Sequence, residues 1–273
     1  MIAVTPGLFA DSALPAAVVA GEEIMRVLAE PGLQVREKAD LSPVTEADMR
    51  AHRVITSKLM DTGIPVLSEE GRDIPYEERR KWEYYWLVDP LDGTREFIDG
   101  TGEFTVNIAL IGGGDPLFGV IYVPVRREMF FTGTDGKLFS LRIPEGCLDA
   151  GEMERLAAEV KPQEQKPGSP LRVVASRSHL NEETRAFIGL LKKEHPDLLT
   201  VSRGSSLKFC MMARGEADLY PRLGKTMEWD TAAGQAIARA AGCRVLRMAD
   251  HRPLRYNKPS LENPWFVVIP PPL

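Results

Sequence analysis

The sequence contains little cysteine and no long apolar run. The three cysteines, Cys147, Cys210 and Cys243, are odd in number and widely spaced among 273 residues, and they form no CxxC pair. This pattern disfavours a disulfide framework and is typical of a reduced, cytoplasmic protein. The stretch without charged residues from Phe104 to Gly114 is too short to span a bilayer. We therefore expect no transmembrane segment, while peripheral association with the cytoplasmic face of the inner membrane stays open.

The sequence also lacks an excess of basic residues. Lys and Arg total 34 against 39 Asp and Glu, which gives a formal net charge of −5. No run of Lys and Arg is long enough to follow a nucleic-acid backbone, so polymeric nucleic acid is not expected as a partner. A single small anion could still bind to local basic residues. With 44% hydrophobic residues, the chain can bury a substantial core.

The apolar pattern predicts two helices followed by a sheet. Apolar residues recur every three or four positions in residues 13–30 and again after Thr45, as in amphipathic helices. A short strand, 64–67, and a longer one, 84–88, each end on acidic residues. Three further strand-like runs predict an antiparallel meander; they cover residues 104–111, 118–123 and 128–132.

A polar segment with several prolines, residues 148–170, separates this half from one in which strands and helices alternate. Such segments are typical of domain boundaries, and the alternation is typical of α/β domains. We therefore predict an α+β domain over residues 1–160 that carries most of the metal ligands. An α/β domain over residues 161–273 would contribute substrate selectivity and one further ligand.

Acidic residues lie where strands are predicted to end or helices to begin. Glu69, Asp89 and Asp92 follow strands, while Asp48 and Asp230 fall in the first turns of predicted helices. A capping role alone explains a first-turn carboxylate. If instead Glu69, Asp89, Asp92 and Asp230 converge, two carboxylates about 4 Å apart repel by roughly 4 kcal/mol at an effective dielectric constant near 20. A hard divalent cation would relieve this repulsion, and all-oxygen ligands favour Mg²⁺.

The residues after Asp92 predict an anion site beside these carboxylates. Gly93 and Thr94 stand where a helix could begin, and the free N–H groups of a helix start attract anions. A site that attracts both a cation and an anion suits a metal-bound phosphate. The ordinary alternative is a strand that ends in an acidic turn.

Four motifs, in order along nearly the whole chain, resemble those of the lithium-sensitive, magnesium-dependent phosphatases. This superfamily includes inositol monophosphatases and fructose-1,6-bisphosphatases. The motifs are SPVTEAD at 42–48, SEEG at 68–71, DPLDGT at 89–94 and WDTAA at 229–233. The resemblance implies an α/β fold class, in the form of a layered α-β-α-β-α sandwich.

Three further segments are similar to the CysQ branch of that superfamily, the 3′(2′),5′-bisphosphate nucleotidases. They are ASRSH at 175–179, GSSLKFC at 204–210 and YPRLG at 220–224. The continuation of the central motif, REF at 95–97 followed by GEFTVN at 102–107, is also similar, although Arg95 stands where the branch commonly has Lys. The resemblance implies hydrolysis of the 3′-phosphate of adenosine 3′,5′-bisphosphate (PAP) to AMP and phosphate. It also implies a role in clearing the PAP left by sulfate activation.

The resemblance further implies a metal site and the residues that activate water. Two Mg²⁺ ions would be held by Glu69, Asp89, the Leu91 carbonyl, Asp92 and Asp230. A third, weaker ion would lie near Glu69 and Asp48. Glu69 and Thr94, helped by Asp48, would direct a metal-activated water in line at the phosphorus.

Substrate binding is expected from both halves of the chain. The residues implied are Gly93, Thr94 and Asp230 around the reacting phosphate, and Ser176, His179, Ser205, Ser206, Lys208 and Arg222 around the rest of the nucleotide. Alternatively, the two adjacent serines cap the next helix and Lys208 is a solvated helix residue. Other functions left open are cleavage of 3′-phosphoadenosine 5′-phosphosulfate, inositol monophosphatase activity, and a non-catalytic nucleotide or Mg²⁺ sensor.

Overall fold

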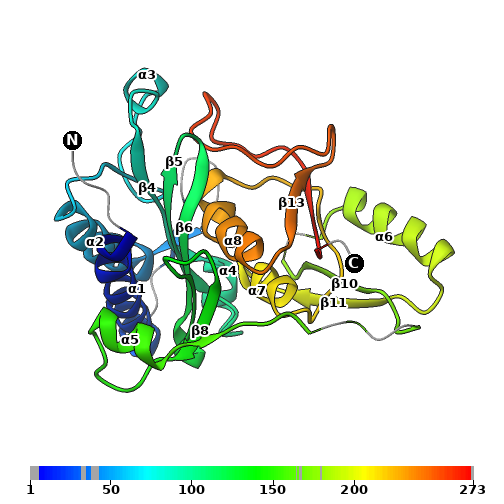
Figure 1. Cartoon of the computed structure of the whole chain (residues 1–273), viewed down its shortest axis with the longest axis horizontal. Helices are drawn as coiled ribbons and strands as arrows, with labels where there is room; N and C mark the ends of the chain where they lie inside the picture. Colours follow the sequence, from blue (N-terminus) through cyan, green and yellow to red (C-terminus); the bar gives the residue numbers. More distant parts are fainter. Residues whose placement is uncertain are drawn as a thin grey trace.

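The computed structural model describes residues 6–31, 35–37, 43–163, 165, 168–178 and 180–271. Figure 1 shows layers that follow one another from the N-terminal helices to α6. Helices α1 and α2 cover one face of a large sheet, α7 and α8 lie beyond it, and small sheets separate these from α6. The α/β fold class with alternating helical and sheet layers is confirmed.

The first helical layer and the large sheet come from the first 160 residues. Helix α1 (Pro6–Ala29) packs against α2 (Glu46–Met60), and β1 (Val35–Glu37) pairs with β2 (Pro43–Thr45) just before α2. The sheet order follows the chain, from β3 to β9. Its strands are β3 (Val66–Ser68), β4 (Tyr84–Asp92), β5 (Thr105–Gly112), β6 (Asp115–Val123), β7 (Glu128–Thr132), β8 (Leu138–Arg142) and β9 (Ala158–Glu159).

The second half supplies the remaining layers. Strand β10 (Arg172–Ser176) pairs in parallel with β11 (Leu199–Arg203), and β14 (Phe266–Ile269) lies between β12 (Tyr220–Arg222) and β13 (Arg244–Arg247). The helices of this half are α6 (Glu182–Glu194), α7 (Leu207–Ala213) and α8 (Glu228–Ala240). The short elements are α3 (Tyr76–Arg79), α4 (Thr94–Ile98), η1 (Pro124–Arg126) and α5 (Ala150–Leu156).

Both faces of the large sheet are buried, which explains the nearly continuous apolar run in β4. Trp86 and Val88 join the core formed with α1 and α2, whereas Tyr85 and Leu87 join the core formed with α8. Alternate residues of a strand point to opposite faces, so a doubly covered strand needs apolar residues at every position. This burial holds the end of β4 in a fixed place.

Helix α8 lies unusually close to its neighbours because small residues stand at the contacts. A Cβ atom added to Gly119 of β6 would lie 2.7 Å from the Cβ atom of Ala236 on α8, and one added to Gly234 of α8 would lie 2.2 Å from the ring of Phe209. Real side chains do not approach so closely, and a buried contact of this kind transmits strain. The glycines therefore fix the position of α8 against the sheet and α7.

The predicted elements match the structure closely. The meander of three strands and the helix over residues 182–194 are confirmed, and β8 extends the same meander. Helix α5 and strand β9 fall in the polar segment with several prolines, residues 148–170, for which the sequence predicts a domain boundary and no particular element. The division near residue 160 stays a prediction, and one apolar core contains residues from both sides of it. Within the described chain, no helix has the length and apolar character needed to cross a membrane.

Arg79 connects the first half of the chain to the C-terminal loop. Its side chain is 3% exposed, and its guanidinium donates to the carbonyls of Ile74, Lys258 and Pro259 and to the Asn257 side chain at 2.9–3.2 Å. Replacement of Arg79 by Met is expected to destabilise the protein by about 3 kcal/mol, because several buried acceptors lose their donors. At roughly 2–3 °C per kcal/mol, Tm should fall by about 6–9 °C in a thermal melt.

Arg80→Met is the control for this substitution. Arg80 is exposed and pairs with Glu77 on the surface, and such pairs contribute little to stability. Its melt should stay within about 1 °C of the wild type. An equal loss in both variants would show that the buried hydrogen bonds of Arg79 carry no special weight.

Candidate active site

A cavity of about 650 Å³ lies where the end of β4, helix α4 and the starts of α7 and α8 meet. Most of the residues predicted to form a site line it, from both halves of the chain. They are Glu69, Asp89, Leu91, Asp92, Gly93, Thr94, Ser176, Ser205, Ser206, Lys208, Arg222 and Asp230. His179 lies outside the described residues, and Asp48 accepts a hydrogen bond from Thr94, which lines the cavity.

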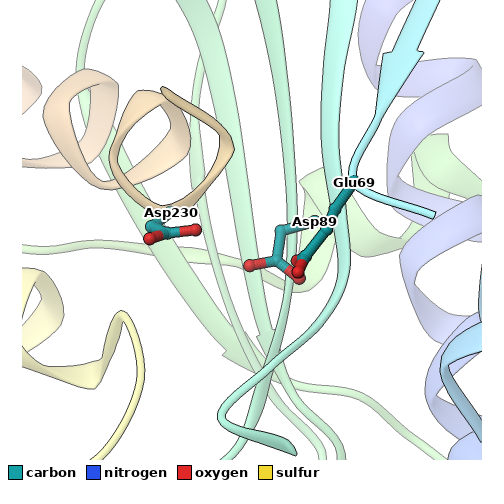
Figure 2. Close-up of side chains that lie close together, drawn as sticks. All are labelled: Glu69, Asp89 and Asp230. Carbon is teal, nitrogen blue, oxygen red and sulfur yellow. The ribbon is translucent and has the colours of Figure 1, made fainter. Parts of the chain in front are cut away.

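Three carboxylates converge at one end of this cavity. One oxygen from each of Glu69, Asp89 and Asp230 can be chosen so that all three lie within 4.8 Å of one another. Figure 2 shows their side chains pointing into a common space between α8 and the sheet. Glu69 directly follows β3, its N–H donates to the Val88 carbonyl at 3.1 Å, and Asp89 follows Val88 within β4. The parallel pairing of β3 and β4 therefore brings the two acids together.

An irregularity in β4 explains how Asp92 can join Asp89. Asp89 pairs with Asn107, but Asp92 pairs with Thr105, so β4 has one more residue than β5 over this span. In a regular strand, residues three apart point to opposite faces. The extra residue reverses this alternation, as β-bulges do. Both carboxylates consequently line the same cavity, while Leu91 joins the core beneath α1.

Asp230 has the electrostatic environment of a cation ligand. It stands in the first turn of α8, where its carboxylate accepts from the Met227 N–H at 2.9 Å. Desolvation and the negative charges of Asp92 and Glu69 raise the pKa of Asp230 above its usual range. Carboxylates this close disfavour one another's ionised form. A divalent cation would reverse that cost.

Thr94, which lines the cavity, is hydrogen-bonded to Asp48. The Thr94 hydroxyl donates to the Asp48 carboxylate at 3.2 Å, and this carboxylate also accepts from the N–H and hydroxyl of Thr45 at 2.7 and 2.6 Å. Thr45 is the N-cap of α2, so the capping role considered for Asp48 is real. The same carboxylate orients Thr94, and a catalytic role for Asp48 stays a prediction.

A hydrogen-bond network from both halves fixes Asp92. Its carboxylate accepts from the Ser206 hydroxyl at 2.6 Å and from the Asn107 amide at 3.1 Å. The Asn107 amide also donates to the Ser206 hydroxyl at 2.8 Å, and Thr105 in turn donates to the Asn107 side chain at 3.1 Å. Such outer partners orient metal-binding carboxylates. In this structure the Ser206 hydroxyl therefore faces Asp92, and its predicted contact with substrate stays untested.

Lys208 is buried and holds the loop that precedes α7. Its ammonium group donates to the carbonyls of Arg203, at 3.3 Å, and Ser205, and it lies over the Tyr220 ring. Burial lowers its pKa to about 8. The alternative of a solvated helix residue is wrong, because only 4% of Lys208 is exposed. Ser205 adopts a left-handed backbone with φ of 44°, a strained conformation that the surrounding contacts must maintain.

Sequence reasoning missed several residues around the cavity. Asn107 supports Asp92, Ser178 lines the cavity and donates to Glu96 at 2.6 Å, and Glu103 binds the backbone of Gly204 at 2.8 Å. Asn107, Ser178, Glu96 and Glu103 all lie inside or beside segments that resemble the nucleotidases. The segments gave a signal, but only the fold shows which partner each side chain meets.

Comparisons with known proteins agree with this geometry. A profile of the Inositol monophosphatase family matches residues 8–265. The 3′(2′),5′-bisphosphate nucleotidase CysQ of Escherichia coli O157:H7 is 47% identical over 255 residues, which cover 91% of this chain and 94% of that protein. The structure is also similar to CysQ from Bacteroides thetaiotaomicron, with a TM-score of 0.88, 44% identity and 99% of each chain covered.

More distant solved structures share the fold. The inositol monophosphatase from Anabaena (Nostoc) sp. PCC 7120 has a TM-score of 0.70 and 22% identity, with 97% of this chain and 91% of that chain covered. At this identity the likeness shows the arrangement of helices and sheets alone.

Proposed function

The chain belongs to the inositol monophosphatase family, and we propose that it is a 3′(2′),5′-bisphosphate nucleotidase. Its reaction would be hydrolysis of the 3′-phosphate of PAP to AMP and phosphate. The observation that carries this proposal is the convergence of Glu69, Asp89 and Asp230 at one end of a cavity that both halves of the chain line. The high identity to CysQ nucleotidases over nearly their whole length supports the choice of substrate.

The donor set fits magnesium. The three converging ligands are carboxylates, without His or Cys among them, and hard oxygen donors of this kind suit Mg²⁺. Glu69, Asp89 and Asp230 would hold the metal, with Asp92 and the Leu91 carbonyl as further ligands. We propose two ions, with a third, weaker one near Glu69 and Asp48. Bound Mg²⁺ supplies Lewis-acid stabilisation of the charge on the phosphoryl oxygens.

The protein's own groups would position the reactants. Glu69 and the Thr94 hydroxyl orient the attacking water, with Thr94 itself held by Asp48, and Glu69 accepts the water proton. The backbone N–H groups of Gly93 and Thr94 donate to the phosphate. The water oxygen bonds to phosphorus as the bond from phosphorus to the ribose 3′ oxygen breaks. That ribose oxygen takes up a proton, which leaves AMP and phosphate.

The second half of the chain would recognise the rest of the nucleotide. Ser176, Ser205 and Arg222 line the cavity from the second half, and Lys208 adds a positive charge there. His179 stays a proposed contact from the resemblance alone. An inositol phosphate offers no 5′-phosphate or base to these groups.

Phosphate release from three substrates tests the proposal. With Mg²⁺, we expect kcat/KM for PAP to exceed that for inositol 1-phosphate by at least about 100-fold. Inositol 1-phosphate lacks the second phosphate, and the loss of its hydrogen bonds to cationic groups should reduce transition-state stabilisation by about 3 kcal/mol. EDTA should abolish release, and Li⁺ should inhibit it. 3′-Phosphoadenosine 5′-phosphosulfate is the third substrate and measures tolerance of a 5′-sulfate. Equal or better turnover of inositol 1-phosphate would overturn the proposal in favour of an inositol monophosphatase.

A further inference from the structure

Two buried carboxylates of the first half hold the segments of the second half that line the cavity. Glu96 lies on α4 and Glu103 just before β5, and they are 4% and 8% exposed. Neither belongs to the acidic cluster at the end of β4. Their partners are the residues after β10 and the loop between β11 and α7.

Glu103 binds both of these segments at once. One oxygen accepts from Arg177 Nη2 at 2.9 Å, and the other accepts from Arg177 Nε at 3.0 Å and from the Gly204 N–H at 2.8 Å. Arg203 adds a second positive charge, with its nitrogen 3.7 Å away. Burial alone would raise the pKa of Glu103, but these donors and charges lower it, so the carboxylate stays ionised.

Glu96, Gly93 and Gly204 lie where the two halves of the chain approach each other closely in this region. The Ser178 hydroxyl donates to Glu96 at 2.6 Å. A Cβ atom added to Gly204 would lie 2.5 Å from the Glu96 side chain and 2.8 Å from the Glu103 carbonyl. One added to Gly93 would lie 3.3 Å from the Ser205 side chain. The backbone at Gly93 therefore lies close to Ser205, and the backbone at Gly204 lies close to Glu96 and Glu103, with no room for a side chain between them.

The position of Glu103 suggests a role in selectivity. Arg177 directly follows Ser176 at the end of β10, and Gly204 directly precedes Ser205; both serines line the cavity. We propose that Glu103 is a positioning residue that sets the distance between the reacting-phosphate subsite and the nucleotide subsite. This inference rests on the proposed function and names a residue that determines its substrate preference. Glu103 itself touches neither the substrate nor the reacting atoms.

Charge-assisted bidentate hydrogen bonds are both strong and directional. Without the charge on Glu103, Arg177 and the Gly204 N–H must share a weaker neutral acceptor, and the two segments can move apart. A misplacement of about 1 Å lowers the efficiency of a site that needs several contacts at once. A small phosphate ester, which occupies only the reacting-phosphate subsite, should not respond.

The test compares Glu103→Gln with the wild type on two substrates. We expect KM for PAP to rise about tenfold while kcat changes less than threefold. For p-nitrophenyl phosphate, kcat/KM should change less than threefold. Parallel losses on both substrates, or no change on either, would overturn the inference, because a structural defect does not discriminate between substrates.

The chain offers a matched control at the opposite end of β10. The Asp218 carboxylate accepts two hydrogen bonds from the Arg172 guanidinium, at 2.7 and 3.0 Å, and one from the Arg172 N–H at 2.8 Å. Its side chain is 10% exposed, as is that of Glu103. Asp218→Asn should lower Tm without altering the ratio of kcat/KM values for the two substrates. A changed ratio in this control would also count against the inference.

Arg177→Gln tests the same contact from the exposed side and replaces Glu103→Gln as the test if that variant fails to fold. Where both single variants fold, the double variant should show the same KM for PAP as either of them, because each removes the same ion pair. Fully additive effects would contradict a shared role.

Binding of AMP and of inorganic phosphate, measured by calorimetry with Mg²⁺, separates this inference from the proposed function. Glu103→Gln should weaken AMP binding about tenfold and leave phosphate binding within threefold. If the wild type hydrolyses p-nitrophenyl phosphate but not PAP, the proposed function fails, and the binding comparison still decides the inference. Equal weakening of both ligands would refute it.

Discussion

Replacing Asp89 by Asn should lower kcat/KM for PAP by at least about a thousandfold, equivalent to roughly 4 kcal/mol of transition-state stabilisation. Asp89 is 2% exposed and lies between Glu69 and the carboxylate of α8 in the converging cluster. Neutralising it removes the central anionic ligand from a hard-cation site. Asn has the same shape and keeps an oxygen to accept the Leu91 N–H, which bonds to Asp89 at 3.1 Å. The fold should therefore persist.

Thermal melts with and without Mg²⁺ identify the cause of that loss. A ligand that binds only the folded state raises Tm, so Mg²⁺ should stabilise the wild type and have much less effect on Asp89→Asn. Asp61→Asn is the control, since Asp61 is an exposed carboxylate at the C-cap of α2. It should retain wild-type activity and the full Mg²⁺ response. An Asp89→Asn variant with more than a tenth of wild-type activity would remove Asp89 from the metal site.

The order of helices and strands could be predicted because it depends on local patterns. Alternating and three-to-four residue periodicities place α2, α6 and the meander without knowledge of their partners. Acidic residues at strand ends likewise pointed to the cluster, and the pairing of β3 with β4 brings Glu69 to Asp89. A parallel pair places the ends of its strands at one edge of the sheet, so local sequence indicates the two acids, and the pairing seen in the structure brings them together.

The bulge in β4 was not predictable in the same way. The residues between Asp89 and Asp92 include Pro90, which donates no backbone hydrogen bond, but nothing local shows which strand opposes them. Only the pairing with β5 decides whether Asp92 faces the cavity or the core beneath α1. A register shift is a property of two strands, whereas periodicity describes one.

The roles of Ser206 and Lys208 also depend on distant contacts. Both stand in a segment that resembles the nucleotidases, which suggested direct contact with substrate. In the structure, Ser206 binds the Asp92 carboxylate and Lys208 binds loop carbonyls. A hydroxyl or ammonium group in a motif can support the site as well as touch the ligand. The choice between these depends on which donor or acceptor lies nearest in the folded chain.

Replacing Asp230 by Asn should have opposite effects on activity and on the stability of the metal-free protein. Activity on PAP should fall by about a thousandfold or more, because a metal ligand is lost. In EDTA, however, Tm should rise by about 5 °C. Carboxylates 4–5 Å apart repel by roughly 3–4 kcal/mol at an effective dielectric constant near 20. Partial protonation relieves part of this repulsion, so the substitution should add about 2 kcal/mol to the free energy of unfolding. Each kcal/mol raises Tm by roughly 2–3 °C.

The helix start should tolerate this change. The Asn side-chain oxygen can still accept the Met227 N–H, which bonds to Asp230 at 2.9 Å. Asp218→Asn provides the contrast in the same melts, because its carboxylate is paired with Arg172 and its neutralisation should lower Tm. Opposite signs in these two Asp→Asn variants would show that the carboxylates of the cavity repel one another until a cation binds. A lower Tm for Asp230→Asn in EDTA would mean that Asp230 stabilises the fold by itself, and that its position reflects helix capping rather than metal binding.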